Sequence, residues 1–219
     1  PVMRMMPVKV DLPDPRAFQA VIFTSRHAVK NFVDNQKSVH WLSVPAYSVG
    51  RATSLAAKKA GFSLVVTGQG GGRGLIPLIT GDLYPADGKL LWLSANSISF
   101  DLQAQLASNQ FTVERLTAYK MPKVKSSDIQ LLGKLMACKA AAAVVMSARS
   151  MSFFRGLLDS SGCASYRSKV SLILGSSNIA KTAGSGWDQI IVARSPRRSR
   201  LLAIATLLHR QSSAHGHDN

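Results

Sequence analysis

Length, composition and charge exclude several classes of protein. A chain of 219 residues that is 46% hydrophobic can bury a core, which argues against global disorder, and no apolar run approaches the ~20 residues of a membrane span. The chain carries 27 Lys and Arg against 11 Asp and Glu, a net charge of +16, which predicts a polyanionic partner: nucleic acid, anionic lipid, or a small molecule with several carboxylates or phosphates.

The first half of the chain alternates short apolar runs with amphipathic stretches. Strands are predicted at residues 20–25, 46–50, 63–68, 89–94 and 112–119. The helix after residue 50 is predicted to point Ala52, Leu55, Ala56 and Ala60 inward and to end at Gly61. Another helix is expected at residues 99–108. This alternation predicts parallel strands joined by right-handed helical crossovers.

The same pattern restarts in the second half. A helix is predicted at residues 126–139, then a strand at 141–147, a helix from Ser150, a strand at 170–175, a helix from Ser177, a strand at 189–193 and a helix at 198–209. The stretch "YSVGRATSLAAKKAGF" matches "LILGSSNIAKTAGSGW", with Gly50 against Gly175. We therefore expect two α/β units built on one plan. The polar residues 211–219 are expected to be a disordered tail.

Standard catalytic and cofactor motifs do not explain the chain. The glycine-rich stretch 68–74 fails both the dinucleotide and the P-loop patterns, which favours an ordinary turn over a phosphate cradle. Histidine and cysteine spacings predict no metal site. Cys138 and Cys163 indicate free thiols in a reducing, cytoplasmic compartment. The basic cluster at residues 194–200 is typical of a solvated surface or of an anion site, and both interpretations stay open.

Hydroxyl and amide side chains recur where the predicted strands end. They are Thr24 and Ser25, Thr53 beyond Gly50, Ser147 and Ser150, and Ser176, Ser177 and Asn178 beyond Gly175. In open α/β sheets the carboxyl ends of the strands form the ligand crevice, and helix N-termini there attract anions. Plain helix capping by Ser and Thr accounts for the same pattern. The residues alone leave the two interpretations balanced.

Six segments, in order, resemble the uroporphyrinogen-III synthase family over about residues 1–208. They are "VIFTSRHAV", "SVGRATSLAAKKAGF", "GKLLWLS", "VERLTAYKMP", "AAVVMSARS" and "LGSSNIAKTAGSGW". The chain departs from the family at Asn178, where a threonine is usual, and at Arg26 and His27, where small or polar residues are common.

The resemblance implies an α/β fold of two flavodoxin-like three-layer αβα domains with parallel sheets, joined by a two-stranded linker, with the active site in the cleft between them. The implied boundaries are a central domain at 11–117, linker strands at 1–10 and 118–122, a second domain at 123–210 and the tail at 211–219. The second domain is expected to lack its N-terminal strand and helix, so that the chain is a fragment or a defective copy.

The resemblance also implies a function, the cyclisation of hydroxymethylbilane to uroporphyrinogen III in haem biosynthesis. This linear tetrapyrrole carries eight carboxylates; it is closed with loss of water and inversion of ring D, without cofactor or metal. Tyr119 matches the tyrosine proposed as proton donor. The implied substrate-binding residues are Thr24, Ser25, Arg26, Gly50, Thr53, Ser147, Ser150, Gly175, Ser177 and Asn178.

The expected partners follow from the same resemblance. They are the tetrapyrrole substrate and hydroxymethylbilane synthase, which would hand that substrate over to a cytoplasmic monomer; no membrane or nucleic acid is expected. Two alternatives remain. One is a non-catalytic, two-lobed anion-binding or regulatory module, and the other is a nucleic-acid binder driven by the charge of +16.

Overall fold

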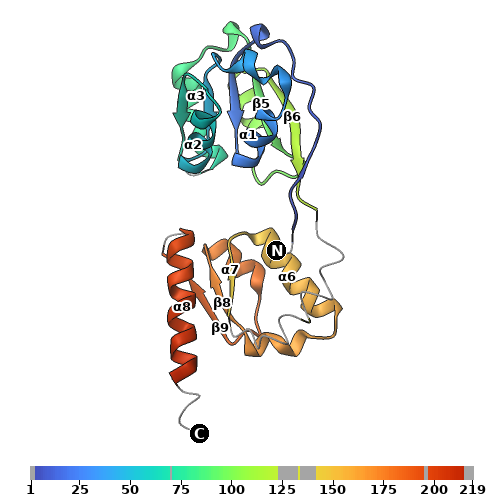
Figure 1. The fold of residues 1–219 in the computed structure, drawn as a ribbon, viewed down its shortest axis with the longest axis vertical. Coiled ribbons are helices and arrows are strands. Elements are labelled where there is room, and N and C mark those ends of the chain that lie inside the picture. Colours follow the sequence, from blue (N-terminus) through green and yellow to red (C-terminus); the bar gives the residue numbers. More distant parts are fainter. Residues whose placement is uncertain (1–2, 70, 123–132, 134–141, 195–196, 215–219) are drawn as a thin grey trace. The chain divides into compact units, whose positions relative to one another are not determined.

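A computed structural model describes residues 3–69, 71–122, 133, 142–194 and 197–214. The chain divides into two compact units (Figure 1), which we call the first unit, Met5–Pro122, and the second unit, Pro1–Arg4 with Lys123–Asn219. The predicted helix at residues 126–139 lies outside the described residues. Within the described residues, no helix is long and apolar enough to cross a membrane.

Within residues 3–69 and 71–122, the first unit forms a six-stranded sheet with the order β1-β6-β5-β2-β3-β4. The strands are β1 (Met6–Pro7), β2 (Phe18–Phe23), β3 (Ala46–Ser48), β4 (Val65–Thr67), β5 (Lys89–Ala95) and β6 (Val113–Lys120). Strands β2 to β6 pair in parallel. Strand β1 pairs antiparallel with β6, with Met6 opposite Lys120 and Pro7 opposite Tyr119, inside the stretches expected as linker strands.

The strand order corrects the expected topology. Numbered from β2, the parallel strands run 3-2-1-4-5 across the sheet, whereas a flavodoxin-like sheet runs 2-1-3-4-5. The apolar runs identified the strands, but the pattern along one chain does not say on which side each crossover places the next strand. Here the chain leaves β2 toward β3 and β4 and then returns to β5 on the other side. The switch in direction therefore lies between β2 and β5.

Alternating residues of the strands supply two cores, one on each face of this sheet. Val21 and Phe23 pack with α1 (Arg26–Val33) and α2 (Arg51–Lys59), whereas Ala20 and Ile22 pack with α3 (Ile76–Asp82) and α4 (Leu102–Ala107). Short 3₁₀ turns complete the unit at Pro15–Ala17, Gln36–Trp41, Gly72–Leu75 and Pro85–Asp87. The first unit is thus a sheet covered by helices on both faces.

Helix α2 confirms its predicted end and part of its predicted inward face. It ends at Lys59 with Ala60 as its C-cap, and Gly61 follows with φ +99°, the left-handed conformation expected of a C′ glycine. Its buried residues are Thr53, Ser54 and Ala57. Of the residues predicted to point inward, Ala56 and Ala60 pack against the core, whereas Ala52 is exposed and Leu55 is 49% exposed. The Ser54 hydroxyl accepts a hydrogen bond from Thr67 of β4 (2.8 Å), which turns this side of the helix toward the sheet.

Within residues 142–194 of the second unit, three parallel strands pair in the order β7-β8-β9. They are β7 (Ala142–Val145), β8 (Ser171–Leu174) and β9 (Gln189–Val192). Helices α6 (Ala148–Ser160) and α7 (Ser177–Ala183) pack on one face and α8 (Arg198–Ala214) on the other, so that β8 and β9 lie between α7 and α8 in Figure 1. A 3₁₀ turn at Ala164–Lys169 precedes β8. The succession β7-α6-β8-α7-β9 repeats β2-α1-β3-α2-β4 of the first unit.

Two helix limits differ from the sequence-based prediction. Helix α6 begins at Ala148, because Ser147 adopts an extended conformation and its side chain accepts the Ser150 N–H. Helix α8 runs to Ala214, past the end predicted at His209, so residues 211–214 are not part of a disordered tail. The sequence has no glycine or proline between the start of this helix at Arg198 and Gly216, which explains the longer helix. The rest of the expected tail lies outside the described residues.

Candidate active site

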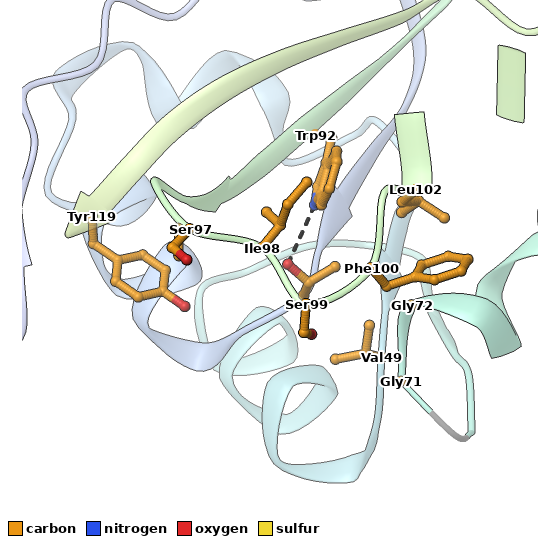
Figure 2. A pocket seen from close by; sticks show the side chains of 12 residues that line it. Val49, Gly71, Gly72, Trp92, Ser97, Ile98, Ser99, Phe100, Leu102 and Tyr119 are labelled. Carbon is orange, nitrogen blue, oxygen red and sulfur yellow. Dashed lines mark hydrogen bonds between the residues drawn. The ribbon is translucent and has the colours of Figure 1, made fainter. Parts of the chain in front are cut away.

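A cavity of about 200 Å³ opens at the carboxyl ends of β2, β5 and β6 in the first unit. We call it the switch-point pocket, because the crossover connections change direction between β2 and β5, where open α/β sheets bind ligands. Figure 2 shows the side chains that line it. Its polar members are Thr24, Trp92, Ser97, Ser99 and Tyr119.

Tyr119 lies on β6 and is 8% exposed, with its hydroxyl pointing toward the other lining side chains (Figure 2). The register of the β5–β6 pairing shifts just before Tyr119: Ser94 pairs with Thr117, while the next residue, Ala95, pairs with Tyr119. The Tyr119 carbonyl accepts the N–H of Asn96 (3.0 Å). The predicted proton donor is thus held in a wall of the pocket.

Thr24 enters the same pocket from the end of β2. Its Oγ1 accepts a hydrogen bond from Nε1 of Trp92 (3.2 Å), drawn as the dashed line in Figure 2. Because an indole N–H only donates, the Thr24 oxygen is the acceptor, and its own hydrogen is available to donate to a ligand. Of the predicted site residues, Thr24 and Tyr119 are the two that line this pocket in the described residues.

The other predicted residues of the first unit have different surroundings. Ser25 caps α1, its Oγ accepting the His27 N–H at 3.1 Å, and Arg26 is exposed in the first turn of that helix. Gly50 is the N-cap of α2. Thr53 is 7% exposed and its N–H donates to the Gly50 carbonyl (3.0 Å). The capping interpretation therefore holds for Ser25, and Thr53 belongs to the packing of its helix.

In the second unit the predicted residues follow the carboxyl ends of β7 and β8. Ser147 caps α6, and its Oγ lies 2.7 Å from that of Ser150. Gly175 is buried, and its N–H donates to the Val145 carbonyl (3.2 Å). Ser177 and Asn178 are exposed in the first turn of α7. These two strand ends thus combine the capping hydroxyl of Ser147 and the neighbouring hydroxyl of Ser150 with two exposed polar side chains.

The sequence-based prediction missed the two loops that make most of the remaining wall. The loop 96–100 after β5 contributes Ser97, Ile98, Ser99 and Phe100, and the glycine-rich turn contributes Gly71 and Gly72. The turn needs its glycines: Gly71 has φ +79°, and a Cβ on Gly72 would lie 3.0 Å from the Phe100 ring. A Cβ on Gly74 would overlap the Gln69 carbonyl oxygen.

Gly74→Ala is expected to distort this turn. The clash is with backbone, so the chain must shift, at a cost of about 1–3 kcal/mol in unfolding free energy, and the affinity for ligands of the pocket should fall with it. Gly81→Ala in α3 is the matched control: its Cβ meets open space, and we expect a change under about 1 kcal/mol, toward stability. Urea unfolding of both variants measures the difference. Equal stability of the two variants would contradict the prediction.

His27 stands beside Tyr119, with the centres of the two rings 5.7 Å apart. Burial, followed by the charges of Arg26 and Lys30, lowers the pKa of the His27 imidazole. The folded chain therefore binds this proton less readily than the unfolded chain, whose histidine pKa is about 6.5. Stability from this group is present above that pH and is lost as the pH falls below it.

His27→Gln is accordingly expected to flatten the loss of unfolding free energy between about pH 7 and pH 5. Urea titrations of both proteins at several pH values measure the slope. His40→Gln is the control, because it replaces an exposed histidine of the same unit. A steeper acid loss in His27→Gln than in the parent would refute the assigned direction.

Comparisons with known proteins give a consistent result. Residues 1–203 match the model of the family described as uroporphyrinogen-III synthase HemD. The structure is similar to the crystal structure of uroporphyrinogen-III synthetase from Helicobacter pylori, with a TM-score of 0.67, 18% identity, and 94% of this chain and 91% of that one covered. It is also similar to the crystal structure of a mutant uroporphyrinogen III synthase from Thermus thermophilus, with a TM-score of 0.60 and 16% identity. That match covers 96% of this chain and 88% of the other. No curated protein sequence matched significantly.

Proposed function

Because this chain belongs to the uroporphyrinogen-III synthase family, we propose that the switch-point pocket is where it closes hydroxymethylbilane to uroporphyrinogen III. As a family member the chain is a cyclising lyase of tetrapyrrole and haem biosynthesis. One observation carries the proposal for the pocket: Tyr119, which matches the family's tyrosine, lies in the pocket wall.

Ring closure breaks the carbon–oxygen bond of the hydroxymethyl group, and the departing oxygen needs a proton to leave as water. Tyr119 donates its phenol proton to that oxygen as the bond breaks, and it recovers a proton from the pyrrole carbon that has formed the new carbon–carbon bond. The Thr24 hydroxyl lines the same pocket, with Oγ1 held by Trp92. Folding the linear tetrapyrrole so that its two ends meet contributes the larger part of the rate, as an orientation effect.

The carboxylate arms of the substrate are bound by N–H groups, hydroxyls and cations at the strand ends. In the first unit these are Thr24, the exposed Arg26 and the N-terminus of α2 at Gly50; in the second unit they are Ser147, Ser150, Ser177 and Asn178. Charge-assisted hydrogen bonds of this kind are the stronger ones. The net charge of +16 attracts such a polycarboxylate from solution.

The finer architecture is also proposed. The limits of the two units fall beside β1 and the end of β6, and the antiparallel pair of Pro7 and Tyr119 supports these strands as the linker of a two-domain enzyme. We propose a monomer that works in the cytoplasm and receives its substrate from hydroxymethylbilane synthase. The free thiol of Cys163 is consistent with a reducing compartment.

The test supplies purified full chain with hydroxymethylbilane and separates the isomers of the product after oxidation. We expect the asymmetric isomer, uroporphyrinogen III, to form in excess over the symmetric isomer that arises by spontaneous closure. Binding of the bilane with only the symmetric product would instead indicate the non-catalytic anion-binding module. Binding of random DNA that weakens steeply with salt, without bilane binding, would indicate a nucleic-acid protein.

A further inference from the structure

We propose that Arg115 is a positioning residue of the switch-point pocket: its guanidinium fixes both the loop after β5 and the Thr24 hydroxyl. Arg115 lies on β6 directly opposite Trp92 of β5. The inference deepens the proposed function and rests on it, because it assigns a role in the same pocket to a residue that does not line it.

The first part of the role is the attachment of the loop. Arg115 Nε donates to Ser94 Oγ (2.7 Å), and Nη2 donates to the carbonyl oxygens of Ala95 (2.8 Å) and Asn96 (3.3 Å). These oxygens lie where β5 ends and the wall residues 97–100 begin. Asn96 donates its own N–H to the Tyr119 carbonyl, so that β6 holds the loop base at two places.

The second part of the role passes through Trp92. The guanidinium carbon of Arg115 lies 5.2 Å from the centre of the Trp92 ring, which is 1% exposed. The same indole ring donates a hydrogen bond from Trp92 Nε1 to Thr24 Oγ1. Arg115, Trp92 and Thr24 therefore connect β6, β5 and β2, three neighbouring strands of the sheet, across the point where the topology switches.

Among the described residues, no carboxylate forms an ion pair with Arg115. In the described part of the chain its acceptors are one hydroxyl and two carbonyl oxygens. Lysine cannot reproduce this arrangement, because it lacks the planar fork that binds several acceptors while stacking on an aromatic ring. A cation so placed both orders the loop and favours a polycarboxylate in the pocket next to it.

The experiment compares Arg115→Met and Arg115→Lys with the parent chain. Arg115→Met is expected to lower kcat for uroporphyrinogen III by about 10- to 100-fold, since small misplacement of reacting groups is costly, with KM raised severalfold by the lost charge. Hydrogen exchange of the amides at 96–102 should accelerate. Arg115→Lys, which keeps the positive charge, is expected to bring KM part of the way back to the parent value but to leave kcat as low as in Arg115→Met. Arg16→Met, which removes an 89% exposed guanidinium before β2, should leave all three readouts as in the parent.

Two outcomes would overturn the proposal. One is a folded Arg115→Met with kcat within about twofold of the parent and unchanged exchange in the loop; the other is full rescue of kcat by lysine. If Arg115→Met does not fold, Arg115→Lys decides alone. If the proposed function is wrong, the parent chain makes no uroporphyrinogen III. Arg115 is then still tested by the hydrogen exchange of the loop and by the affinity of the parent and variant chains for uroporphyrin, which serves as a polycarboxylate probe.

Discussion

Tyr119→Phe is expected to lower kcat for uroporphyrinogen III formation by about 100-fold, the low end for removal of a proton donor. The phenylalanine ring still fills the space of a side chain that is 8% exposed and packed with Ala118 and Leu116. Among the described residues the Tyr119 hydroxyl forms no hydrogen bond with the protein, so stability should hardly change. The measurements are the rate of uroporphyrinogen III formation, with the isomers separated, and the melting temperature of the variant.

Tyr84→Phe is the matched control, because this tyrosine lies in the same unit and is 73% exposed. Its kcat and melting temperature should both equal those of the parent. A Tyr119→Phe variant that keeps kcat within about threefold of the parent would remove Tyr119 as the proton donor. The hydroxyls of Thr24, Ser97 and Ser99, which also line the pocket, would then be the candidates for donation to the leaving oxygen.

Phe23→Ala is expected to lower the unfolding free energy of the first unit by about 3–5 kcal/mol. Phe23 is fully buried at the end of β2, and its ring lies 5.4 Å from that of Phe32 in α1 and 5.5 Å from that of Phe62. The cavity left by the ring loosens α1 against the sheet, and with it Thr24 and Ser25, which follow Phe23 directly. Urea unfolding followed by the fluorescence of Trp41 and Trp92 reports on this unit when Trp187 of the second unit is replaced by Phe in all the proteins compared.

Tyr84→Ala serves as the control for Phe23→Ala, since it removes an aromatic ring from the surface and should cost less than about 0.5 kcal/mol. Phe23→Leu should fall between the two because it fills most of the cavity. A loss below about 1 kcal/mol in Phe23→Ala would mean that the aromatic cluster is not what holds β2 and α1 together.

The sequence by itself determined which segments form elements and how several of them begin and end. The apolar runs around Ile22 and Trp92 became buried parallel strands, because a strand covered on both faces has no polar side to show. Ser25 and Ser147 start helices through their side chains, and Gly61 ends one through its backbone. Each of these outcomes depends on contacts within a few residues, which a local pattern encodes. The ordered motifs also identified the family.

Only the tertiary structure decided how these elements combine. The strand order around β2, the exposure of Leu55 on α2 and the place of the glycine-rich turn in the pocket wall all depend on contacts between residues far apart in the chain. Arg115 is the plainest case: in sequence it is one basic residue among 27, yet the pairing of β6 with β5 sets it against Trp92 and the loop carbonyls. Its partners come from a neighbouring strand, and local periodicity carries no information about which strand that is.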